Sequence, residues 1–131
     1  MWNRKGPRVE RNERWKREDA APRLSAEIPG LQSLSLTLKD VREDHGILGK
    51  ERIQHIIVER AAALFEIRCA EIKCQDGGYD ITSEVMNALR RRRETFDGTS
   101  ECRGTVGNGT CRCTLVYVAR ATFVDPGLAK P

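Results

Sequence analysis

All five cysteines of this 131-residue chain lie in two glycine-rich clusters, an arrangement typical of a metal site. The first cluster contains Cys69 and Cys74, and the second contains Cys102, Cys111 and Cys113. Zn²⁺ is commonly held by four thiolates in a tetrahedron, and glycines beside the ligands let backbone amides approach the sulfur atoms. We therefore predict a structural zinc site formed by Cys69, Cys74, Cys102 and Cys111.

The fifth cysteine leaves an alternative open. Cys111 and Cys113 are two residues apart, so on a strand both thiols point to the same side and either could complete the site. A competing interpretation is that most of the cysteines are small buried apolar residues, and a disulfide or redox role is a third. Because every candidate ligand is a thiol and no open coordination position is suggested, we expect a structural metal and no enzymatic activity.

Basic residues gather in two places, and the chain carries a net charge of +4. The N-terminal arm interleaves arginine with tryptophan, which suits phosphate contacts and base stacking. The second cluster ends a predicted helix, where positive charge also complements the helix dipole. The predicted partner-binding residues are Trp2, Arg4, Lys5, Arg8, Arg11, Arg14, Trp15, Lys16, Arg17, Arg90, Arg91, Arg92 and Arg93.

These features favour a small accessory module that binds a polyanion such as RNA, DNA or a ribonucleoprotein. The alternative is an interaction subunit of a protein assembly, whose arm docks on a neighbouring protein through Trp2 and Trp15. The opening residues do not resemble a secretory signal, and no stretch is apolar enough to span a bilayer. We expect a cytoplasmic protein, in a compartment where cysteines favour metal or free thiols over disulfides.

Two strands are predicted from alternation. Leu34, Leu36 and Leu38 alternate with polar residues, which is the pattern of a half-buried strand. Residues 44–46 and Gly49 indicate a loop after it. A second strand, 113–123, has apolar residues on both faces and is predicted to be central in its sheet. The glycines between Cys102 and Cys111 predict a hairpin loop.

The remaining elements are a helix and an ambiguous segment. Residues 83–94 are predicted to form the main helix, capped by Asp80 or Thr82, with an apolar stripe of Ile81, Val85, Met86 and Leu89. Residues 53–69 are predicted to form two strands, 53–59 and 63–69, although a single helix over 50–68 also fits the pattern.

Together these elements predict an α+β fold. We expect an antiparallel sheet of about four to five strands, with one main helix packed on it and the cysteine loops clustered at one edge. The predicted organisation is a charged, partly helical arm at 1–23, a single domain at 24–125 and a tail at 126–131.

Overall fold

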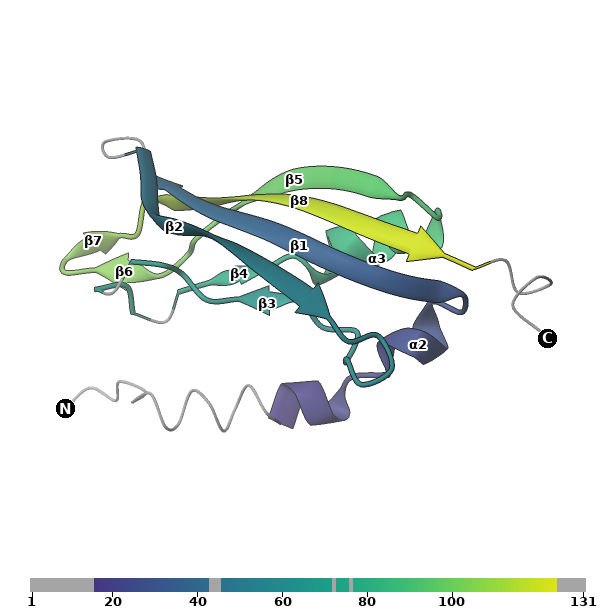
Figure 1. Cartoon of the computed structure of the whole chain (residues 1–131). Coiled ribbons are helices and arrows are strands. Elements are labelled where there is room, and N and C mark those ends of the chain that lie inside the picture. The colour runs from purple at the N-terminus through teal and green to yellow at the C-terminus, as the bar shows by residue number, and fades with distance from the viewer. Residues whose placement is uncertain (1–15, 43–45, 72, 76, 125–131) are drawn as a thin grey trace.

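The centre of the protein is a four-stranded antiparallel sheet (Figure 1). The computed structural model describes residues 16–42, 46–71, 73–75 and 77–124. The strand order is β2 (Gly46–Ile56), β1 (Leu31–Arg42), β8 (Cys113–Phe123) and β5 (Thr95–Glu101). The predicted α+β class is confirmed.

The two central strands form because their apolar residues alternate. Leu34, Leu36 and Leu38 of β1 are buried, and so are Leu115 and Tyr117 of β8. The β1–β8 ladder runs over nearly the whole of both strands, from the pair Leu31 and Phe123 to the pair Arg42 and Cys113. Both predicted strands are therefore confirmed, including the central position of β8.

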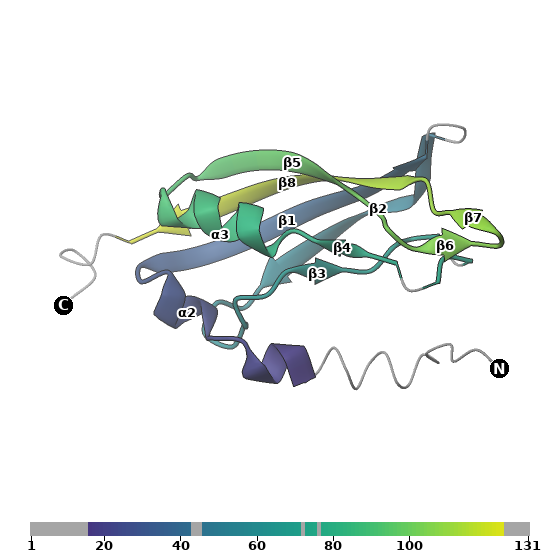
Figure 2. The same ribbon diagram turned by 180° about the vertical axis from the view of Figure 1, so that it is seen from behind.

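The other elements cover one face of this sheet. Figure 2 shows α2 (Leu24–Glu27), α3 (Thr82–Arg90), β3 (Glu66–Ile67) and β4 (Tyr79–Asp80) on the same side of it. The hydrophobic core lies between these elements and the inward residues of β1 and β8. No described element covers the opposite face, where Ile53 is 59% exposed and Val118 is 43% exposed.

Helix α3 has the predicted apolar stripe but ends earlier than predicted. Its first residue, Thr82, donates its backbone N–H to the Asp80 carboxylate at 3.0 Å. The stripe of Ile81, Val85, Met86 and Leu89 is buried.

The early end has a backbone cause. Arg92 adopts a left-handed conformation with φ of 58°, and the Arg92 and Arg93 N–H groups donate to the carbonyls of Leu89 and Ala88. This is the Schellman pattern that ends a helix. Arg91, Arg92 and Arg93 therefore lie beyond the helix, and the four arginines do not share its last turn.

The segment 53–69 contains two strands rather than one helix, but both are shorter than the predicted 53–59 and 63–69, because β2 ends at Ile56, a turn follows at 58–60, and β3 is only Glu66–Ile67. Strand β2 pairs with β1, whereas β3 pairs with β4. Of the loop predicted after β1, residues 44 and 45 lie outside the described residues, whereas Gly46 and Gly49 belong to β2. Residues 49–51 lie opposite the single residue Lys39, a bulge that a glycine readily accommodates.

Strand β5 was not predicted from the sequence, and Gly98 lies within it. Gly98 pairs with Tyr117 across the β5–β8 ladder. A Cβ atom on Gly98 would lie 2.5 Å from the Tyr117 hydroxyl oxygen, so the glycine makes room for that side chain.

The end of the predicted N-terminal helix is present at residues 16–20, and residues 1–15 lie outside the described part of the chain. Arg17 pairs with Glu66 at 2.9 Å, and the Leu24 N–H donates to the Ala61 carbonyl at 3.0 Å. The division into arm, domain and tail stays a prediction. Within the described part, no helix has the length and apolarity needed to cross a membrane.

Substitution in the central ladder tests this core. Leu36→Ala, at a fully buried position of β1, is expected to lower the free energy of unfolding by about 2–5 kcal/mol, because it leaves a cavity. Ile53→Thr, on the uncovered face, is expected to change it by no more than about 0.5 kcal/mol. Urea unfolding followed by circular dichroism measures both, and equal effects would contradict the observed orientation of the sheet.

Candidate metal centre

The four predicted ligands come from two loops at one end of the sheet. Cys69 follows β3 by two residues, and Cys74 follows in a turn closed by its own N–H to the Glu71 carbonyl. Cys102 comes directly after β5, and Cys111 lies between β7 (Gly109–Thr110) and β8. The structure thus brings together residues that are far apart in the sequence.

The four sulfur atoms have the spacing of ligands around one metal ion. All four lie within 4.8 Å of one another. The Sγ atoms of Cys69 and Cys111 are 3.8 Å apart, and those of Cys74 and Cys102 are 3.6 Å apart. A regular tetrahedron with Zn–S bonds of about 2.3 Å has edges of about 3.8 Å. The group could therefore hold a metal ion.

The same distances argue against other thiol chemistry. A disulfide requires about 2.05 Å between sulfur atoms, and all five cysteines are free thiols in the structure. An iron–sulfur cluster spreads its cysteines over several iron atoms, which separates the thiolates more widely than a single ion does. One ion with four thiolates fits the observed spacing best.

Two glycines make this close approach of the loops possible. A Cβ atom on Gly104 would lie 2.5 Å from the Cys74 sulfur, and one on Gly77 would collide with the sulfur atoms of Cys74 and Cys102. The Gly78 and Gly104 N–H groups donate to the Cys102 sulfur at 3.3 and 3.4 Å. These contacts provide the backbone amide environment that stabilises a metal thiolate.

The two loops are also joined through their backbones. Gln75 and Thr105 exchange N–H···O bonds of 2.8 and 3.0 Å. Thr105 begins β6 (Thr105–Val106), which pairs with β7 in the predicted hairpin. The geometry of the loops is therefore fixed by hydrogen bonds as well as by any metal.

Cys113 occupies a different position from the other four. It is 1% exposed and belongs to the hydrophobic core at the start of β8. Burial raises the pKa of its thiol, and so does the hydrogen bond with Cys111. The group of four thus contains Cys111, and Cys113 packs beside it.

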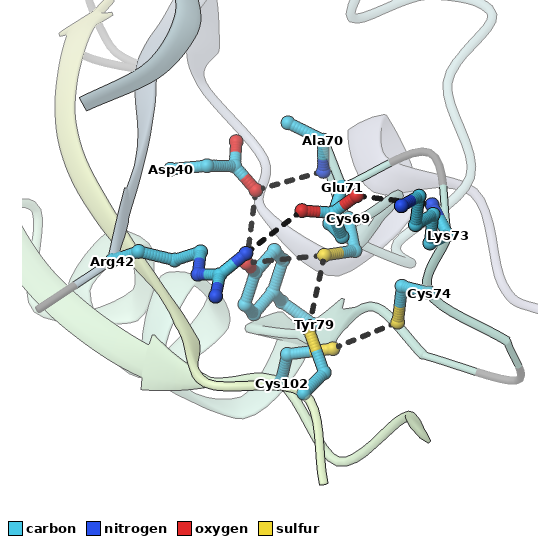
Figure 3. Close-up of polar contacts among 10 residues, drawn as sticks. Asp40, Arg42, Cys69, Ala70, Glu71, Lys73, Cys74, Tyr79 and Cys102 are labelled. Carbon is cyan, nitrogen blue, oxygen red and sulfur yellow. Dashed lines mark hydrogen bonds and ion pairs between the residues drawn. The ribbon is translucent and has the colours of Figure 1, made fainter. Parts of the chain in front are cut away.

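A buried polar network behind the site was missed at the sequence level (Figure 3). The Tyr79 hydroxyl donates to the Asp40 carboxylate at 2.9 Å, and its oxygen lies 3.7 Å from the Cys69 sulfur. Asp40 is 1% exposed, and it also accepts hydrogen bonds from the Ala70 N–H and the Arg52 guanidinium. The sequence signal for this network was the place of Asp40 in the strand, because Asp40 continues the inward alternation of Leu36 and Leu38.

Burial affects the protonation of these groups. It raises the pKa values of the Cys69 and Cys74 thiols. Burial, followed by the hydrogen bond to Asp40, raises the pKa of Tyr79, so its phenol stays protonated. For Cys111, burial acts in the same raising direction, but hydrogen bonds from neighbouring groups, Cys113 first, lower the pKa overall. A metal ion bound here would replace the thiol protons.

The predicted partner-binding residues are not brought together with the metal centre. Those from Trp2 to Trp15 lie outside the described residues. Arg17 is engaged with Glu66, and Arg90 approaches Glu27 at 3.8 Å. Arg92 stacks over the Phe123 ring at 5.2 Å. Lys16, Arg91 and Arg93 remain exposed, with no ion pair to another described residue.

No protein-family model, curated protein or solved structure matches this chain. The chemistry of the site is therefore the basis for any functional conclusion.

Removing a ligand is expected to abolish stoichiometric metal binding. Wild-type protein should carry one metal ion per chain, and Cys102→Ala should carry none, because three thiolates leave the tetrahedron incomplete. Cys113→Ala is the matched control and should keep the metal. Native mass spectrometry measures the metal content, and loss of metal from Cys113→Ala as well as from Cys102→Ala would contradict the placement of Cys113 outside the site.

The loop glycines provide a separate test. Gly104→Ala is expected to weaken metal binding by about tenfold or more, because the added methyl group occupies the space of the Cys74 sulfur. Gly109→Ala is the control in the same hairpin, where the added Cβ meets no atom closer than 4.0 Å. Competition with a chromogenic chelator gives both affinities, and equal values would contradict the close approach of the loops.

Proposed function

We propose that the protein is a small, non-catalytic module, stabilised by a structural zinc ion, that binds a nucleic acid. The observation that supports the metal assignment is the pair of sulfur separations, 3.6 and 3.8 Å, which match the edges of a zinc–thiolate tetrahedron. Zinc is preferred because it takes four thiolates without redox chemistry. Such a complete ligand set leaves no position for a substrate, which supports a structural role.

The small size of the elements at this end supports the same role. Strands β3, β4, β6 and β7 have two residues each, too few to form stable sheets by themselves. A metal that joins Cys69 and Cys74 to Cys102 and Cys111 would supply the missing stabilisation, as in other small domains with few apolar residues. The five free thiols fit a reducing compartment, and we propose the cytoplasm.

Nucleic-acid binding is supported by arginine side chains that form no ion pair with another described residue. Arg91 and Arg93 line a hollow of about 290 Å³ between α3 and β5. Neither makes an ion pair with another described residue. Glu84 and Asp97 line the same hollow, so it carries both signs of charge. The net charge of +4 provides long-range attraction to a polyanion.

Salt dependence tests the proposal. Binding to a short fluorescein-labelled oligouridylate, followed by fluorescence anisotropy, is expected to weaken steeply between about 0.05 and 0.2 M salt, because cations on the strand are released. Arg91→Gln/Arg93→Gln should lower the slope of log affinity against log salt by about 1.4, since each lost phosphate contact counts for about 0.7. Affinity that hardly changes with salt would contradict a nucleic-acid function.

The alternative function, docking on another protein, is favoured by one observation. The uncovered face of the sheet exposes Ile47, Ile53 and Val118, apolar residues of the kind found at protein interfaces. If binding to a partner is insensitive to salt and is lost in Trp2→Ala/Trp15→Ala, this second function replaces the first.

A further inference from the structure

Two arginines lie opposite each other at the base of the β6–β7 hairpin, beside the candidate metal centre. The register of β6 and β7 pairs Thr105 with Thr110. Two backbone bonds extend it, from the Cys111 N–H to the Gly104 carbonyl at 2.8 Å and from the Cys102 N–H to the Cys113 carbonyl at 3.0 Å. In this ladder the residue opposite Arg103 is Arg112.

The alternation of the ladder turns both arginines outward. Their neighbours Cys102, Gly104, Cys111 and Cys113 are buried, whereas Arg103, Thr105, Thr110 and Arg112 are exposed. Arg103 and Arg112 form a pair between two hydrogen-bonded pairs, the position in which opposite side chains lie closest. We call these four exposed residues the hairpin face.

The hairpin face carries positive charge that no other described residue neutralises through an ion pair. Residues 103–112 contain no acidic residue. Neither Arg103 nor Arg112 has an ion pair with any other residue that the structure describes, including Glu101, the exposed acid two residues before Arg103. Like charges directly opposite each other in a sheet are destabilising. An anion between the two guanidinium groups would remove this repulsion.

The obvious competing role is neutralisation of the metal centre, because one divalent ion with four thiolates carries a formal charge of about −2. The geometry disfavours this role for the pair. The two arginines project from the face opposite to the buried sulfur atoms, so their charges point to solvent.

We propose that Arg103 and Arg112 form a phosphate clamp that binds the backbone of a single-stranded nucleic acid, with the hydroxyls of Thr105 and Thr110 as further donors. The clamp rests on the nucleic-acid function proposed above and gives it a location. Guanidinium groups bind phosphate oxygens through paired N–H donors. Because Cys102 and Cys111 each adjoin an arginine of the pair, the metal sets the separation of the clamp, and nucleic-acid binding depends on metal.

The test compares Arg103→Gln/Arg112→Gln with a control of identical charge change, Arg60→Gln/Arg120→Gln, whose arginines are exposed elsewhere on the surface. The probes are fluorescein-labelled oligouridylate and oligodeoxythymidylate, titrated in fluorescence anisotropy at several salt concentrations. The clamp variant is expected to lose about tenfold or more in affinity, and its salt slope should fall by about 1.4. The control should retain the wild-type slope to within a few tenths.

Three further measurements make the result decisive. Native mass spectrometry of each variant reports the metal, and because Cys102 and Cys111 are in the hairpin, retained metal shows that the hairpin is formed. Arg103→Lys/Arg112→Lys, which keeps both charges, should recover most of the salt slope. Inorganic phosphate is expected to compete only weakly with the strand, because a single phosphate cannot make the successive contacts that a backbone makes.

The outcomes separate the clamp from the function on which it rests. If the wild-type protein binds neither oligonucleotide, the proposed nucleic-acid function fails and the clamp fails with it. If the wild type binds but the clamp variant and the control bind equally well, the clamp is overturned and the function stands. Loss of metal from the clamp variant alone, or full competition by inorganic phosphate at low concentration, also overturns it.

Discussion

The convergence of four sulfur atoms is the constraint on which one end of this molecule depends. The pairs that meet are separated by 42 and 28 residues of chain. The loops that carry these cysteines adjoin β3, β4, β6 and β7, strands of only two residues each. Such short segments bury little surface and lose conformational entropy on folding, so a metal ion bound by the four thiols would supply stability that packing there does not.

The other end of the molecule is organised by apolar burial, and the two ends meet at β1 and β8. Cys113 begins β8 and lies next to the ligand Cys111. On β1, the buried Asp40 reaches Tyr79, whose hydroxyl oxygen lies near the Cys69 sulfur. Asp40 has three hydrogen-bond donors, which offset the cost of burying its charge. The cysteine loops are therefore connected to the central ladder by hydrogen bonds.

The elements with regular patterns could be predicted from the sequence, and those shaped by contacts could not. β1, β8 and the stripe of α3 follow from alternation and helical spacing. Gly98 gives no local signal for a strand. It lies in β5 because its missing side chain leaves room for the Tyr117 hydroxyl group, a contact that depends on the tertiary fold. The end of α3 depends on the left-handed backbone conformation of Arg92, which no local sequence pattern predicts.

The candidate site divides in the same way. Residue type and clustering were enough to select the four cysteines that the fold brings together. The hydrogen-bonded support from Tyr79 and Asp40 depends on the tertiary fold, since 39 residues separate the two. Composition alone does not show which cationic residues are available to a partner. Arg17, Arg90 and Arg92 have partners within the chain. Arg103 and Arg112 become a candidate pair only because the backbone hydrogen bonds place them opposite each other.

The pairing of β1 with β8 also determines when the protein can fold. The central ladder joins the first strand of the sheet to the last, so its contacts are among the longest in sequence that the chain can make. During translation, the hairpin of β1 and β2 leaves the ribosome long before its partner β8 has been synthesised. Its leucine-rich inner face then remains exposed, which favours aggregation and makes chaperone binding useful. The cysteine loops are synthesised in the same interval, so metal binding at the four cysteines would also come late, close to the pairing of β8 with β1.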